Sequence, residues 1–168
     1  MAELIWRHAR PCDLETIASW VDSARALERW AGPGLTWPIK ASALFEQLGG
    51  NELPSFCLTQ DDLAVAFGQL FVKGDKRQHL ARIIVSPAHR GIGLGRQLCH
   101  RLLEEARSRH ATHITLNVFA DNQAALALYR RLGFVPAGKP DARGVLPMRL
   151  PAFAGTADNT DNGPTDNG

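Results

Sequence analysis

Apolar and polar residues follow one another along this chain in blocks that predict a succession of strands and helices. The predicted helices share apolar residues at helical spacing and lie at 14–21, 23–30, 41–48, 97–109 and 122–132. The predicted strands are short apolar or alternating runs and lie at 4–7, 55–59, 63–70, 80–85, 112–118, near 134 and at 145–150. Asp13 is expected to cap the first helix. Strands joined by crossover helices indicate a mixed α/β sheet.

The segment 89–96, His-Arg-Gly-Ile-Gly-Leu-Gly-Arg, lies where a strand pattern gives way to a helical pattern. Glycine lets the backbone adopt unusual φ/ψ values and approach a ligand closely. A helix N-terminus directs unpaired N–H groups and the positive end of the helix dipole at an anion. We therefore expect a phosphate site formed by Arg90, Gly91, Ile92, Gly93, Leu94, Gly95 and Arg96.

Two common phosphate-binding loops do not fit this spacing. A dinucleotide fingerprint starting at Gly91 would need a third glycine where Arg96 stands, and the predicted strand 112–118 lacks the expected acidic residue. A Walker loop would need Gly-Lys-Ser/Thr, which is absent. The pattern that remains is R-x-x-G-x-G, and it resembles the pyrophosphate loop of the GCN5-related N-acetyltransferase (GNAT) family.

A second block strengthens this resemblance. Residues 122–134 match the family signature N-x-x-A-x-x-L-Y-x-x-x-G-F almost letter for letter. The resemblance is clear over 80–136 and weaker over 4–73, and it is closest to ribosomal-protein N-terminal acetyltransferases. It implies one domain, 1–154, with a mixed, mostly antiparallel twisted sheet, a splayed central parallel pair and flanking helices.

The resemblance also implies acetyl-coenzyme A as co-substrate and assigns residues to it. The backbone of Ile83, Ile84 and Val85 would bind the pantetheine amides as an added strand, although the same residues also fit a core strand. Asn122 would contact the coenzyme, whereas its position alone predicts a helix N-cap. Tyr129 would be the general acid that protonates the leaving thiolate, whereas periodicity alone also allows a core aromatic.

The general base is the main departure from the family pattern. The ribosomal-protein group favours a glutamate at the position of Asn117, and asparagine does not accept a proton at neutral pH. Glu28, Asp75 and His79 are replacement candidates, but each also fits an ordinary surface residue, so none is assigned. A water held by backbone carbonyls is a further alternative.

By family analogy the acceptor side is formed by segment 22–37 and by the loop after Leu132. Trp20, Trp30 and Trp37 concentrate aromatic area in this part of the chain. These side chains predict either an apolar acceptor pocket or ordinary core packing.

These features together predict an N-acetyltransferase, an acyltransferase that moves acetyl to a primary amine of a small molecule or protein in a ternary complex. The alternative is a catalytically inactive coenzyme A-binding or regulatory module. Asn117 supports the alternative, whereas the presence of Tyr129 argues against it.

Composition narrows the remaining possibilities. The 168 residues fit one domain, and a formal charge of +2 does not by itself indicate nucleic-acid binding. Three scattered cysteines predict neither a disulfide framework nor a metal site and fit a reducing cytoplasm. No signal pattern or membrane span is expected, and a monomer or homodimer is predicted. The polar segment 155–168 is expected to be a flexible low-complexity tail.

Overall fold

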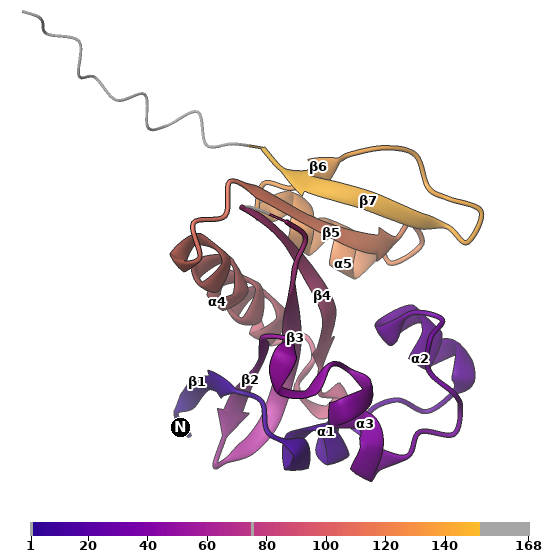
Figure 1. Ribbon diagram of the computed structural model, residues 1–168, viewed down its shortest axis with the longest axis vertical. Coiled ribbons are helices and arrows are strands. Elements are labelled where there is room, and N and C mark those ends of the chain that lie inside the picture. Colours follow the sequence, from indigo (N-terminus) through magenta and orange to yellow (C-terminus); the bar gives the residue numbers. More distant parts are fainter. Residues whose placement is uncertain (1, 75, 152–168) are drawn as a thin grey trace, which may run out of the picture.

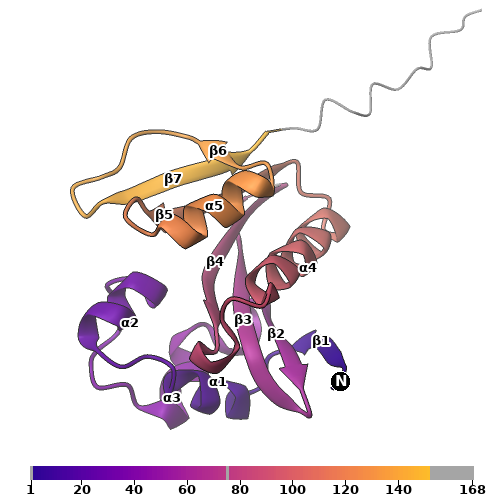
Figure 2. The same ribbon diagram turned by 180° about the vertical axis from the view of Figure 1, so that it is seen from behind.

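The computed structural model describes residues 2–74 and 76–151, which form a seven-stranded sheet with helices on both faces (Figures 1 and 2). The strands are β1 (Leu4–His8), β2 (Ser55–Gln60), β3 (Leu63–Val72), β4 (Arg77–Val85), β5 (His113–Phe119), β6 (Val135–Pro136) and β7 (Val145–Leu150). The α-helices are α1 (Pro11–Ala18), α2 (Ala24–Ala31), α3 (Ala41–Gln47), α4 (Leu94–Ser108) and α5 (Gln123–Arg131), and the short 3₁₀ helices are η1 (Gly50–Glu52) and η2 (Pro87–His89). The predicted tail, 155–168, lies outside the described residues.

One parallel strand pair interrupts an otherwise antiparallel sheet of order β1-β2-β3-β4-β5-β7-β6. The strands β4 and β5 pair only from Arg77↔His113 to Leu80↔Leu116. Beyond Leu80, β4 continues to Val85 without a partner on its β5 side, and the two strands diverge (Figure 1). The predicted fold, including its splayed parallel pair, is confirmed.

A β-bulge shapes β4 close to this divergence. The β3–β4 register passes from Phe67↔Ile84 to Gln69↔Ala81, so Gly68 faces two residues of β4. One of these, Arg82, has a φ of 51°, in the left-handed region that L-residues seldom adopt. A bulge bends its strand and increases the local twist. The bulge therefore turns the end of β4 next to the point where it leaves β5.

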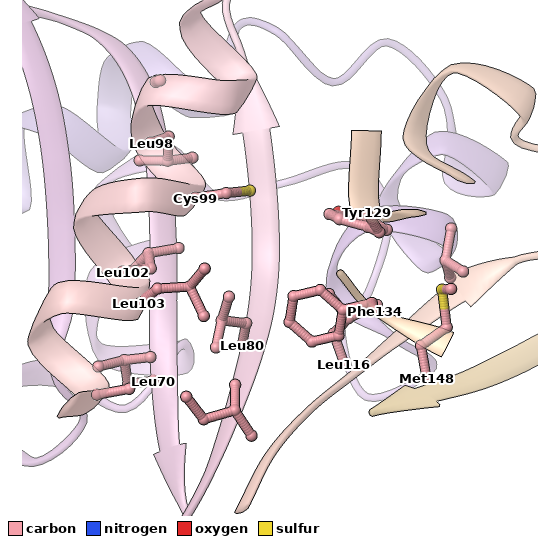
Figure 3. Close-up of a cluster of buried hydrophobic side chains, with 14 of the residues drawn as sticks. Leu70, Leu80, Leu98, Cys99, Leu102, Leu103, Leu116, Tyr129, Phe134 and Met148 are labelled. Atoms are coloured by element: carbon pink, nitrogen blue, oxygen red, sulfur yellow. The ribbon is translucent and has the colours of Figure 1, made fainter. Parts of the chain in front are cut away.

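Two apolar cores cover the two faces of the sheet. Helices α4 and α5 lie on one face, where Leu98, Leu102 and Leu103 of α4 are buried (Figure 3). Helices α1, α2 and α3 pack on the other face around a second buried cluster (Figures 1 and 2). Because both cores include residues of β3, this strand holds the two halves of the molecule together.

Two helix starts differ from the predictions. Asp13 is the third residue of α1 rather than its cap, because Pro11 begins the helix two residues earlier. Its buried carboxylate accepts hydrogen bonds from the Arg10 backbone at 2.7 Å and from the Arg7 guanidinium at 2.6 and 2.9 Å. Helix α4 begins at Leu94 rather than at 97, so the last glycine of the loop lies inside its first turn.

Gly68 offers a test of the contact between β3 and α4. A Cβ atom there would lie 2.7 Å from Leu102 Cδ1, in a fully buried environment. We expect Gly68→Val to lower the free energy of unfolding by about 1–3 kcal/mol in urea titrations, because the core is already filled. Gly34→Val is the control, since a Cβ atom at Gly34 has no neighbour within 4 Å. Equal stability of the two variants would contradict this packing argument.

Candidate active site

A cavity of about 360 Å³ lies where β4 and β5 diverge. Helix α2, the diverging strands, the start of α5 and the start of β7 all contribute to its wall. The lining residues are Glu28, Arg29, Trp30, Ala31, Gly32, Phe71, Lys73, His79, Leu80, Ala81, Arg82, Ile83, Leu116, Asn117, Val118, Phe119, Asn122, Ala125, Tyr129, Arg143 and Val145.

Tyr129 is the tyrosine of the predicted signature, and it is both buried and part of the cavity wall. Its ring packs edge-on against Phe134, in the apolar core drawn in Figure 3. Burial, with a smaller contribution from Cys99, raises the pKa of the Tyr129 phenol above its usual range. The phenol is therefore protonated at neutral pH, and the same raised pKa makes it a weaker proton donor than an exposed tyrosine.

Asn122 lies at the start of α5, on the same cavity wall. Its side-chain oxygen accepts a hydrogen bond from the Ala125 backbone at 3.2 Å, so the predicted N-cap is confirmed. Its predicted contact with the coenzyme stays a prediction.

The glycine loop lies directly before α4, and there is free space around its first two glycines. Gly91 and Gly93 have φ values of 79° and 86°, and a Cβ atom on either would have no neighbour within 4 Å. A Cβ atom on Gly95 would instead lie 3.4 Å from Leu128 and 3.8 Å from Val85. The loop thus sits beside the contact of α4 with α5 and the end of β4. Arg90, Ile92 and Arg96 are exposed there, and Leu94 is buried beneath the loop.

The predicted coenzyme strand, 83–85, begins at the second residue of the bulge, Ile83. Ile83 lines the cavity, whereas Ile84 packs on the core with α1–α3 and Val85 on the core with α4 and α5. The side chains therefore do belong to the cores, while the backbone edge toward β5 has no strand partner. A strand edge of this kind presents N–H and C=O groups to an added chain.

Charged side chains connect α2 to the opposite wall of the cavity, a feature that the sequence analysis missed. Arg29 binds Asp121 at 2.6 Å, and Arg143 binds Glu28 at 3.1 Å. Both guanidinium groups also face the Phe119 ring, at 4.3 Å for Arg29 and 6.0 Å for Arg143. These partners are 92 and 115 residues apart in the chain, so no local pattern indicated them.

The backbone of the bulge is tied to α2 and to β3. Trp30 donates from its indole nitrogen to the Arg82 carbonyl at 2.8 Å, and the Arg82 guanidinium donates to the Gln69 side chain at 3.0 Å. Trp30 is the only one of the three predicted aromatic residues that lines this cavity. Trp37 is 39% exposed, and Trp20 packs against the core with α1–α3.

The candidate bases differ in their surroundings. Asn117 lines the cavity, as expected for the base position, but it carries an amide. His79 also lines the cavity, and its Nδ1 lies 2.7 Å from the Thr115 hydroxyl. Burial, and then the charge of Lys73, lower the pKa of His79 to about 4. Glu28 lines the cavity too, while Asp75 lies outside the described residues.

Other predicted features can be placed briefly. All three cysteines are free, and burial raises the pKa of the Cys99 thiol to about 12, as expected for a structural thiol rather than a nucleophile. Residues 2–74 and 76–151 hold no cluster of three or more potential metal-binding side chains. The helices in that part of the chain are all too short or too polar to span a bilayer.

The lowered pKa of His79 predicts a pH dependence of stability. Between about pH 6.5 and 4 the unfolded histidine binds a proton that the folded one does not, so the folded state loses stability as the pH falls. We expect this effect to reach on the order of 2–3 kcal/mol and to disappear in His79→Gln, measured by denaturant titration across this range. The exposed His113 provides the control, since His113→Gln should follow the wild type. Parallel curves for all three proteins would contradict the assignment.

Comparisons with known proteins agree with the fold and the motifs. The acetyltransferase (GNAT) family matches residues 19–134. The [ribosomal protein bS18]-alanine N-acetyltransferase of Escherichia coli (strain K12) is 39% identical over 85 residues, which cover 51% of this chain and 57% of the relative. Its crystal structure superposes with a TM-score of 0.68 at 27% identity, covering 92% of this chain and 98% of the other.

Two further proteins are also similar to this chain. Streptothricin acetyltransferase of Streptomyces lavendulae is 37% identical over 81 residues, 48% of this chain and 43% of the relative. The chain thus spans about half the length of the curated relatives it matches. The PaiA N-acetyltransferase of Thermoplasma acidophilum, in complex with coenzyme A, shares the fold with a TM-score of 0.66 at 15% identity over 90% of this chain and 99% of the other. With its family match, signature residues and splayed sheet, the chain belongs to the GNAT acetyltransferase family.

Proposed function

We propose that this protein is an acetyl-coenzyme A-dependent N-acetyltransferase that transfers acetyl directly to a primary amine in a ternary complex. The observation that carries the proposal is the cavity between β4 and β5, with Tyr129 in its wall. The glycine loop of α4 lies beside the same gap, through the contact of Gly95 with Leu128 and Val85. In this proposal the glycine loop would hold an anionic group, the free edge of 83–85 would bind an extended chain, and Tyr129 would supply a proton.

The residues present fit coenzyme A. The open backbone at Gly91 and Gly93, at the N-terminus of a 15-residue helix, suits the pyrophosphate, and Arg90 and Arg96 add positive charge. The free edge of 83–85 would bind the pantetheine amides. Asn122, already in the cavity wall, would contact the chain of the coenzyme near the thioester.

The acyl transfer needs two proton movements. The amine nitrogen attacks the thioester carbonyl carbon, the new C–N bond forms, and the C–S bond breaks. Tyr129 would donate its proton to the departing sulfur. The proton of the amine must leave as well, and the Asn117 amide does not take it at neutral pH. Glu28, His79 and water in the cavity remain the candidate acceptors.

An inactive coenzyme A-binding module is the second candidate, because Asn117 replaces the glutamate implied for this position. The two hypotheses differ in one measurement, the release of thiol from acetyl-coenzyme A in the presence of a panel of amines and peptides. Amine-dependent release supports transfer, while coenzyme binding with no release for any amine supports the binding module.

A pair of variants at Gly93 tests the phosphate site. Aspartate and asparagine both tolerate the left-handed backbone found at this position, and they differ mainly in charge. We expect Gly93→Asp to abolish coenzyme A binding in calorimetry, because a carboxylate would repel the pyrophosphate, whereas Gly93→Asn should retain most of the affinity. Equal affinities for the two folded variants would show that no phosphate binds at this loop.

Tyr129→Phe tests the proton donor. The variant keeps the buried ring and removes only the hydroxyl, so folding and coenzyme affinity should survive. Because a thiol of pKa about 8.5 is already a fair leaving group, we expect turnover to fall by roughly 10²-fold, the lower end for a positioned general acid. The measurement is kcat with an identified acceptor, under conditions where chemistry limits turnover. A wild-type rate would leave Tyr129 as a packing residue beside the coenzyme.

A further inference from the structure

The charge of the cavity wall is strongly unbalanced. Four cationic side chains line it, Arg29, Lys73, Arg82 and Arg143, and Glu28 is the one carboxylate among the described lining residues. His79, with its pKa lowered to about 4, adds no charge at neutral pH. A ligand entering this cavity therefore meets an excess of positive charge, which lies mainly on Lys73 and Arg82 because Asp121 and Glu28 pair with Arg29 and Arg143.

The nearby carboxylates already have cationic partners. Glu28 is bound by Arg143 at 3.1 Å, and Asp121 is bound by Arg29 at 2.6 Å. An acceptor with a second ammonium group would have to displace one of these arginines or remain unpaired against the cationic wall. Unpaired charge in a partly enclosed site is unfavourable.

One further cationic side chain lies on the face of the sheet that carries Phe71 and His79. Directly opposed residues of neighbouring strands project from the same face, and one such row runs Phe71, His79, Thr115 and Arg149 across β3, β4, β5 and β7. Phe71 and His79 of this row line the cavity, and Arg149 is exposed at its far end. This row therefore adds one positive charge, that of Arg149, to the face of the sheet that Phe71 and His79 share.

The positive charge of Arg82 is only partly compensated by its surroundings. Its guanidinium is held by the neutral side chain of Gln69 and stacks over Phe71 at 5.2 Å. Burial lowers its pKa, because the charged form is incompletely solvated. An anionic group entering the cavity would stabilise this charge.

We propose that the acceptor is an amine that also carries an anionic group such as a carboxylate, and that Lys73 and Arg82, rather than the ion-paired Arg29 and Arg143, bind this group at the cavity wall. The inference rests on the proposed transferase function and narrows its acceptor class. Anionic amines are selected by attraction to the basic wall, whereas polyamines and other polycations are rejected by the same charges.

Calorimetry on the protein saturated with coenzyme A measures acceptor binding without transfer. Two series vary only the charge next to the amine: γ-aminobutyrate, γ-aminobutyramide and putrescine, and the dipeptide amides Ala-Glu, Ala-Gln and Ala-Lys. In at least one series we expect the anionic member to bind about tenfold more tightly than the cationic one, with the neutral member between them. Absence of this order in both series overturns the proposal.

Two charge-reversal variants test whether Lys73 causes this preference for anionic amines. Lys73→Glu should abolish or reverse the order while leaving coenzyme A affinity unchanged. Lys40→Glu makes the same change at an exposed lysine outside the cavity lining and should retain the order. An equal effect of both variants, or a loss of coenzyme A affinity in Lys73→Glu, overturns the assignment of Lys73. Thiol release from acetyl-coenzyme A without a charge preference contradicts this inference alone, whereas a charge preference without thiol release contradicts the proposed function.

Discussion

The candidate site depends on the short pairing of the two parallel strands. The strands β4 and β5 share only the register from Arg77↔His113 to Leu80↔Leu116 before they separate. Longer pairing would fill the gap with backbone hydrogen bonds and leave neither a cavity nor a free strand edge. The bulge opposite Gly68 bends β4 next to this point, and hydrogen bonds from Trp30 and to Gln69 hold its left-handed residue, Arg82.

The two sides of the gap are stabilised by different forces. On the proposed coenzyme side, α4 and α5 belong to one core of buried apolar side chains. On the proposed acceptor side, α2 is connected through partly exposed ion pairs to Asp121 and Arg143. Exposed ion pairs contribute little to stability and can be rearranged at small cost. We infer that the first side serves a constant ligand and that the second is where acceptor preference is set.

Local sequence patterns predicted most of the fold, and the family resemblance predicted several residues of the site. Every predicted helix and strand is present, and β7 has the predicted bounds. Tyr129 and Asn122 were found because residues 122–134 resemble the family signature, and helical spacing places the two residues two turns apart on one face. Both line the cavity, together with Ile83 and Asn117. The ion pairs of α2 and the conformation of Arg82 could not be predicted, since they depend on contacts between distant segments.

The sequence by itself determined the order of elements, the glycine loop and the family signature, because each follows from residues close together in the chain. The sequence also contained an indication of the bulge that the prediction did not use, namely Gly68 within an apolar strand. The tertiary structure decided where β4 leaves β5 and which charges face the resulting cavity. The divergence of the strands and the charges at the cavity both depend on packing between segments as far apart in the chain as α2 and β7. Local propensities carry no information about such contacts.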